Sequence, residues 1–219
     1  MSDRRAVHAE ILKLARLLQV EPARLSYLEA VRVEDLRAFR DQATEALFAA
    51  HDGALRRLAA TSRLLPVALV ANLARTTFGP VLAARVAGLL EPERADDVGQ
   101  RLPTEFVADI AIELDPRRAS AVIARIPPAR ILEITRVLAR RKEYVTMGRF
   151  VGHLDDEALG AALEALSDED LVQTLVVMEE PLDLDRLIQL GGRDRVDRLA
   201  ALPGSPIARP RRRSRASSG

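Results

Sequence analysis

The sequence predicts an all-α protein in which an N-terminal helical hairpin or small bundle precedes a superhelix of short helical repeats. Apolar residues recur at spacings of three and four along almost the whole chain, and the alternating pattern of β-strands is absent. Aromatic residues make up only 3% of the chain. From Leu90 onwards an apolar residue also recurs every twelve positions, which predicts repeats of about 12 residues. The pattern leaves open whether the superhelix is right- or left-handed.

Composition predicts a cytoplasmic protein with an ordinary hydrophobic core. The chain has 219 residues, of which 48% are hydrophobic, and it contains no cysteine, which excludes disulfides and thiolate metal sites. Lysine occurs only at Lys13 and Lys142, so nearly all of the 33 basic residues are arginine, as in a GC-rich bacterial genome. Because 32 acidic residues balance them, the arginine content is weak support for nucleic-acid binding.

The first predicted domain covers residues 1–61. Val7, Ile11 and Leu14 lie on one face of a first helix, and charged residues interrupt its apolar stretch, so we do not interpret it as a signal peptide. Pro22 ends this helix and begins the next segment. A longer helical run extends from about Val33 to Leu64. Its buried side is predicted to contain Leu36, Phe39, Ala43, Leu47 and Leu55 to Leu58.

The second predicted domain, residues 62–203, opens with the most apolar stretch of the chain. Three arginines interrupt this stretch, at Arg63, Arg75 and Arg85. Each would cost about 3 kcal/mol at the centre of a membrane span. We therefore expect two buried core helices joined near Thr76 to Pro80. The alternative is a groove along residues 64–90 that binds an apolar ligand, a partner helix or a membrane surface.

The repeat region follows from Leu90. Positions twelve apart are occupied by Leu90, Leu102, Leu114 and Ile126, and then by Leu154, Leu166, Met178, Leu190 and Leu202. Proline follows several of these residues by one or two places, and proline is well tolerated in the first turn of a helix. We therefore expect each unit to begin a new helix after a short turn. Such short helices are unstable alone and must bury their apolar faces against neighbouring units.

The repeat is interrupted between Ile126 and Leu154. The segment 139–154 combines arginine with aromatic residues, the types that concentrate binding energy at protein interfaces. One interpretation is a partner-binding surface formed by Arg140, Arg141, Tyr144, Arg149 and Phe150. The other is an inserted helix whose apolar side chains pack the joint between two half-stacks. The two are compatible if only the arginines face outwards.

The unit sequences resemble a known family. The segments LEPERADDVGQRLP, LDPRRASAVIARIP and LDDEALGAALEALSDEDL, within Leu90 to Leu202, are similar to the cytosolic N-terminal domain of MgtE-type magnesium transporters. More distantly, they resemble the helical repeats of the flagellar motor-switch protein. The resemblance implies a superhelix of short helices whose acidic residues help to sense magnesium. In the transporter a nucleotide-binding-like module and transmembrane helices follow this domain, whereas a basic tail follows here, which predicts a stand-alone relative.

Two acidic clusters are the candidate ligands for Mg²⁺. They consist of Asp155, Asp156 and Glu157, and of Asp168, Glu169 and Asp170. Hard cations bind carboxylate oxygens, but each cluster also falls at a predicted helix start, where acidic side chains cap free N–H groups. Ser167 with Asp170 is typical of a capping box. We therefore favour the structural role and keep Mg²⁺ binding as an alternative.

Residues 204–219 are expected to be a disordered basic tail. Between Ser205 and Gly219 there are five arginines and no acidic residue. Such a segment is usually solvated. Contact with nucleic acid, an anionic membrane or an acidic partner is the alternative.

No motif of an active site occurs in the chain. The three histidines are isolated from one another, and neither a phosphate-binding glycine loop nor a nucleophile elbow is present. The sequence therefore favours a non-enzymatic scaffold or regulatory protein that binds a protein partner and needs no cofactor. The alternatives are a Mg²⁺-responsive regulatory module and the binding of an apolar ligand or membrane surface through residues 64–90.

Overall fold

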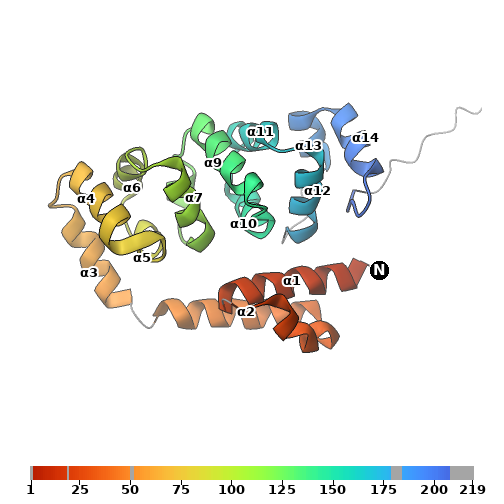
Figure 1. The fold of residues 1–219 in the computed structure, drawn as a ribbon, viewed down its shortest axis with the longest axis horizontal. Helices are drawn as coiled ribbons and strands as arrows, with labels where there is room; N and C mark the ends of the chain where they lie inside the picture. Colours follow the sequence, from red (N-terminus) through yellow and green to blue (C-terminus); the bar gives the residue numbers. More distant parts are fainter. Residues whose placement is uncertain (1, 19, 50–51, 179–183, 208–219) are drawn as a thin grey trace, which may run out of the picture.

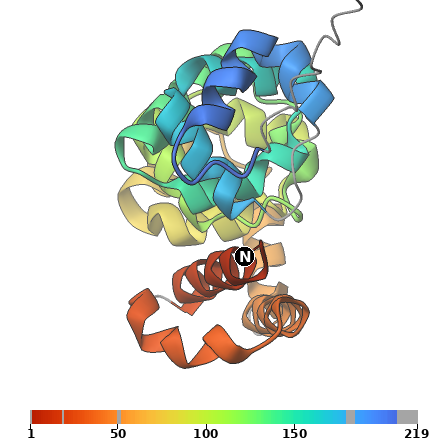
Figure 2. The ribbon, with the colours of Figure 1, turned by 90° about the vertical axis from the view of Figure 1, so that its right-hand side faces the viewer.

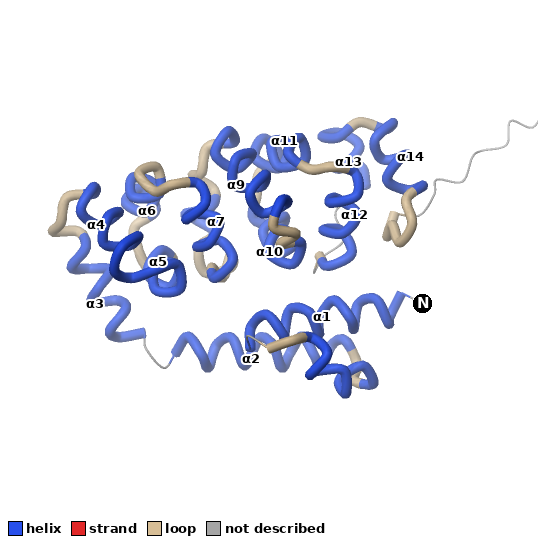
Figure 3. The backbone as a smooth tube through the Cα atoms, in the orientation of Figure 1, coloured by secondary structure: helices blue, strands red, loops and turns tan. Residues whose placement is uncertain are grey.

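The computed structural model describes residues 2–18, 20–49, 52–178 and 184–207. Within these ranges it contains fourteen α-helices and no strand (Figure 3), so the all-α class is confirmed for the described part of the chain. The structure has two parts: residues 2–49, which we call the N-terminal arm, and residues 52–207, which we call the stack. The arm lies to one side of the stack (Figures 1 and 2).

The N-terminal arm consists of α1 (Ser2–Leu18), the 3-10 helix η1 (Pro22–Ala30) and α2 (Val33–Ala49). Helix α1 packs against both η1 and α2. Their buried side chains form one cluster that contains Val7, Ile11, Leu14, Ala15, Leu25, Val33 and Leu36. The arm therefore has a small hydrophobic core of its own.

The predicted buried side of α2 is wrong at Phe39, whose side chain is 53% exposed. Arg40 is buried instead, because its guanidinium donates a hydrogen bond of 2.9 Å to Glu10 Oε2 on α1. Glu10 is itself only 1% exposed and also accepts from Lys13 Nζ at 3.0 Å. An ion cluster inside the arm thus turns α2 away from the orientation that its hydrophobic pattern indicates. The side chain of Leu47 lies outside the described residues.

The stack begins with α3 (Asp52–Ser62), α4 (Val67–Leu73), the π-helical turn η2 (Ala74–Phe78), α5 (Gly79–Ala87), α6 (Pro92–Gly99), α7 (Thr104–Glu113) and α8 (Ser120–Ile123). It continues with α9 (Pro128–Arg140), α10 (Tyr144–Phe150), the 3-10 turn η3 (Val151–His153), α11 (Asp156–Ala165), α12 (Asp168–Val177), α13 (Leu184–Gly191) and α14 (Arg193–Ala201). Most helices pack against the next helix but one. One row contains α3, α5, α7, α9, α11 and α13, and the other contains α4, α6 and α8 followed by α10, α12 and α14.

Several helices begin where the turns of the sequence predict. Helices α6 and α9 begin at a proline, and α11 and α12 are capped by the side chains of Asp155 and Ser167. The unit after Leu114 differs, because α8 starts only at Ser120 and is a single turn. There the Asp115 carboxylate accepts from the backbone N–H of Arg117 at 3.1 Å and stabilises a turn in place of helix. Leu190 also departs from the pattern, since it lies inside α13.

The apolar stretch at 62–90 bends at the predicted joint. Gly79, between η2 and α5, has a φ of 71°, a conformation that glycine adopts without strain. Among the described residues, Val67–Ala87 is the one helical stretch long and apolar enough to cross a membrane, by length and composition only. The expected burial is wrong, because only 17% of its most apolar window is buried and Leu69 and Val81 are exposed. One face packs on the stack and the other faces outwards.

The predicted boundary at residue 203 lies close to the end of the described chain. Ile207 packs against the main hydrophobic cluster of the stack, so the folded part extends at least that far. The remainder of the predicted tail, residues 208–219, lies outside the described residues.

Candidate functional site

A cavity of about 610 Å³ lies within the stack. Its walls come from α3 to α12, and apolar side chains form nearly all of them, among them Leu65, Val70, Phe78, Leu90, Val107, Ile110, Leu138 and Leu159. These residues are the inner faces of successive short helices, which each present one apolar stripe to the interior. We call this cavity the hollow.

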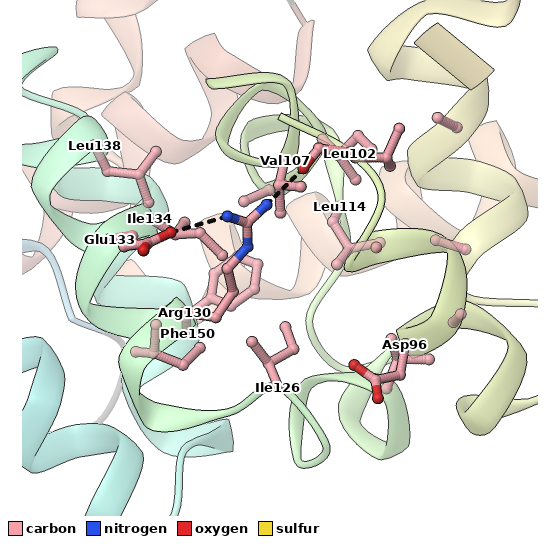
Figure 4. Close-up of a pocket in the computed structure, with 18 of the residues that line it drawn as sticks. Asp96, Leu102, Val107, Leu114, Ile126, Arg130, Glu133, Ile134, Leu138 and Phe150 are labelled. Carbon is pink, nitrogen blue, oxygen red and sulfur yellow. Dashed lines mark hydrogen bonds and ion pairs between the residues drawn. The ribbon is translucent and has the colours of Figure 1, made fainter. Parts of the chain in front are cut away.

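Few polar side chains line the hollow, and its charged side chains form hydrogen bonds with other side chains of the same chain. Arg130 and Glu133 lie on one side of it and Asp96 on the other, with Leu114 and Ile126 between them (Figure 4). Glu133 accepts from Arg130 Nη1 at 2.9 Å, and this hydrogen bond, with a second from Thr104, lowers the pKa of the Glu133 carboxyl. Asp96 accepts from Gln100 Nε2 at 2.9 Å. The arrangement suits the burial of hydrocarbon, with polar contacts only at the edges.

Four arginines link helices across the stack in the same way. Each is the third residue of its helix. Its guanidinium donates to the carbonyl of a leucine that lies two residues before the start of an earlier helix, and that earlier helix is two helices back along the chain. The donors are Arg94, Arg130, Arg186 and Arg195, and the acceptors are the carbonyls of Leu65, Leu102, Leu154 and Leu166. We call these arginines the staples. Because these carbonyls lie in the turns between helices and have no intrahelical partner, each staple satisfies a partly buried acceptor and links two helices.

Three staples also bind the side chain at the first position of the earlier helix. Arg130 Nη1 lies 2.6 Å from Thr104 Oγ1, Arg186 Nε lies 2.8 Å from Asp156 Oδ1, and Arg195 Nε lies 2.9 Å from Asp168 Oδ1. At the fourth staple this position is occupied by Val67, which has no acceptor. The Nε of Arg94 is buried and has no hydrogen-bond partner among the described residues.

The arginines of the predicted partner-binding surface make contacts within the chain. Arg140 donates to Glu105 Oε1 at 2.7 Å, and Arg141 donates to Glu105 Oε2 at 2.7 Å and to Asp109 Oδ1 at 2.6 Å. These bonds join the end of α9 to α7. Arg149 donates to the carbonyl of Leu114 at 2.9 Å. These bonds account structurally for the three arginines, and their role in partner binding stays a prediction.

The two aromatic residues of the same segment lie at different places in the joint. The hydroxyl of Tyr144 donates to Asp170 Oδ1 on α12 at 2.8 Å, and this contact, with burial as the first cause, raises the pKa of Tyr144. Phe150 lines the hollow. The interrupted segment thus connects α7, α10 and α12.

Four of the six candidate metal ligands have structural partners. Asp155 caps α11 by accepting from the N–H of Ala158 at 2.8 Å, Asp156 and Asp168 bind staples, and Asp170 accepts from Ser167 and Tyr144. Glu157 and Glu169 are exposed. Across the described ranges, no group of three or more histidine or acidic residues is close enough together to hold a metal ion. Their arrangement agrees with the role at helix starts.

Comparison of the chain with protein-family models, with curated proteins and with solved structures finds no match. The resemblance of residues 90–202 to the transporter domain therefore stays a prediction based on its turn motifs.

Sequence reasoning missed the staples, and it predicted only the groove along residues 64–90 as part of the hollow. The arginines were attributed to genome composition, although a signal was present: Arg94 and Arg130 each stand four residues after a position of the twelve-residue pattern, Leu90 and Ile126. The hollow had no such signal, because an apolar residue that lines a cavity and one that fills a core look the same in a sequence.

Proposed function

We propose that this chain is a non-enzymatic binding protein that holds an apolar ligand in the hollow of the stack. The observation that carries the proposal is the cavity of about 610 Å³ with almost wholly apolar walls. Pockets for small ligands generally measure about 300–1,000 Å³ and have this composition. An apolar ligand in the hollow would bury its hydrocarbon surface against these walls.

In this proposal the stack is a superhelix of short helical repeats, the hollow follows its axis, and the N-terminal arm is a helical bundle. Two observations support the arrangement: helices pack on the next but one, and five of them begin two residues after a position of the twelve-residue pattern. The proposal also enlarges the groove expected along residues 64–90. Leu65, Phe78 and Leu90 line the hollow, but so do residues as distant as Met178.

A protein-binding scaffold is the second candidate. It is favoured by the exposure of Arg140, whose side chain is 63% exposed at the joint although it pairs with Glu105. The hollow is the stronger argument, because no side chain in the described ranges fills it.

The test uses N-phenyl-1-naphthylamine, an uncharged probe that fluoresces in apolar surroundings. The chain has no tryptophan, so the background is low. We expect saturable binding of the probe, its displacement by dodecanol, and a rise of the melting temperature with dodecanol, because a ligand that binds only the folded state stabilises it.

A matched pair of variants locates the binding site. Ala87→Leu adds volume to the lining of the hollow, whereas Ala60→Leu adds the same volume at an exposed place on α3. We expect the first variant to bind dodecanol at least about 10-fold more weakly and the second to bind it as the natural chain does. Absence of saturable probe binding, or equal loss in both variants, would contradict the proposal.

A further inference from the structure

The charged side chains that line the hollow do not balance one another. Within the described part of the chain they are Asp96, Arg130 and Glu133, which makes two carboxylates and one guanidinium. Arg130 and Glu133 form an ion pair of 2.9 Å. Asp96, on the opposite side of the hollow, therefore carries a charge that the lining does not offset (Figure 4).

The Asp96 carboxylate has an oxygen that a ligand can reach. Its Oδ2 accepts from the uncharged amide of Gln100 at 2.9 Å. Its Oδ1 accepts from no group in the described ranges and, unlike the Nε of Arg94, is not buried. The carboxylate points towards Ile126, which also lines the hollow (Figure 4). Oδ1 is thus an accessible acceptor at the edge of the hollow.

The surroundings of Asp96 favour a cation. Arg94 and Arg101, the arginines nearest to Asp96 in the sequence, donate to backbone carbonyls instead of pairing with it. Asp96 also lies in the last turn of α6, and a helix carries partial negative charge at its C-terminal end. A positive group beside Oδ1 would therefore meet both the carboxylate and the helix end.

The opposite side of the hollow does not suit an anion. The charge of Arg130 is matched by Glu133, and both Nη atoms of Arg130 already have acceptors within the chain. A carboxylate placed there would lie close to the charged Glu133, and like charges repel. The lining as a whole thus favours a cationic head group over an anionic one.

We propose that the ligand in the hollow is a long-chain primary amine, which Asp96 binds as the ammonium ion. The inference rests on the proposed function. Like the side chain of lysine, such an amine is protonated at pH 7. Its ammonium group donates a charge-assisted hydrogen bond to Asp96 Oδ1 at the edge of the hollow. The hydrocarbon chain packs against the apolar walls.

The experiment compares three ligands with the same chain length and different head groups: dodecylammonium, dodecanol and dodecanoate. Each competes with N-phenyl-1-naphthylamine for the full chain, at concentrations below those at which micelles form. We expect the natural chain to bind dodecylammonium about 5-fold more tightly than dodecanol, as a partly exposed ion pair gives. Dodecanoate should bind more weakly than dodecanol.

A matched pair of variants tests the role of Asp96. Asp96→Asn removes the charge and keeps the shape of the side chain, and it should bind dodecylammonium and dodecanol equally. Asp97→Asn removes the same charge one residue further along α6, from an exposed side chain that does not line the hollow. We expect Asp97→Asn to keep the preference.

A third variant keeps the test decisive if Asp96→Asn fails to fold. Gln100→Glu places a second carboxylate next to Asp96 on the lining. It should raise the preference for dodecylammonium above that of the natural chain, and an unchanged or smaller preference would count against the site.

The outcomes separate the two proposals. Equal binding of dodecylammonium and dodecanol by the natural chain, or an equal loss of preference in Asp96→Asn and Asp97→Asn, overturns the role of Asp96 and leaves the hollow as a binding site. Binding of none of the three compounds overturns both proposals.

Discussion

Glu10 carries its charge into the interior of the N-terminal arm. Its side chain is 1% exposed, and three cations surround it: Lys13 at 3.0 Å, Arg40 at 2.9 Å and the half-exposed Arg37 at 3.3 Å. Removing one partner from a buried ion pair leaves the other charge uncompensated in a medium of low dielectric constant. The arm should therefore depend strongly on this one carboxylate.

We predict that Glu10→Gln lowers the free energy of unfolding by about 3 kcal/mol, because the buried Lys13 and Arg40 lose their hydrogen bonds to a charged carboxylate. Urea unfolding followed by circular dichroism measures the change. The control is Asp35→Asn, which breaks the exposed Arg32–Asp35 pair of 2.9 Å and should cost less than about 1 kcal/mol. Similar losses of unfolding free energy in the two variants would show that the buried cluster stabilises the arm no more than an exposed ion pair does.

At the scale of single residues, the sequence predicts burial well where it depends on hydrophobicity and poorly where it depends on charge. Leu36 is buried as its spacing indicates, whereas Phe39 is exposed and Arg40 takes its place. Nothing local to α2 could reveal this, because Glu10, the buried carboxylate that binds Arg40, is 30 residues away on α1. Arg94 gives the same lesson, since its missing acceptor is apparent only by comparison with Arg195.

At the scale of the element, Asp168 shows how a helix start and a staple combine. It is the first residue of α12 and accepts from Arg198 at 2.8 Å and from Arg195 at 2.9 Å. The hydrogen bond from Arg198 is the largest cause that lowers the pKa of Asp168, and the bond from Arg195 adds to it, while burial acts in the opposite direction. The charged carboxylate thus holds α14 against α12.

We predict that this contact makes the stack sensitive to acid. Because the pKa of Asp168 is lower in the folded than in the unfolded chain, its contribution to stability is complete above the ordinary pKa of 3.8 and is lost as the pH falls through the lowered value. Asp168→Asn should therefore lower the melting temperature at pH 7, and the difference from the natural chain should shrink as the pH approaches 3. A difference that stays constant from pH 7 to pH 3 would contradict the assignment.

Helix starts were predictable because their signals are local. Proline at the first position of α6 and α9, and the caps at Asp155 and Ser167, act within one turn of the helix they begin. The short α8 was not predictable from spacing, since the turn at Asp115 depends on a competition between a side chain and the helix for the same N–H groups.

At the scale of the whole molecule, the contacts between the arm and the stack differ in kind from the contacts inside each of them. The buried cluster of the arm contains only arm residues. Across the boundary, α1 packs on α12, Arg16 pairs with Glu143 at 3.0 Å, and Arg117 pairs with Asp41 at 3.1 Å. Burial raises the pKa of Asp41, but the hydrogen bonds and charges of Arg40 and Arg117 outweigh it and lower that pKa.

We predict that the pairing between arm and stack is weak and depends on salt. A double-mutant cycle with Arg16→Ala and Glu143→Ala should give a coupling free energy of about 0.5 kcal/mol at low ionic strength, because both side chains are partly exposed. In about 1 M NaCl the coupling should fall close to zero. A coupling that is large or independent of salt would mean that this pair is shielded from solvent and anchors the arm.

The packing of each helix on the next but one also constrains how such a chain can change in length over evolution. If one helix were duplicated or lost, every later helix would move to the other row. The apolar face of each later helix would then pack against a different helix from before. Gain or loss of two consecutive helices preserves the alternation. Viable relatives of different length should therefore differ by an even number of helices in the stack, a parity rule that their sequences can test.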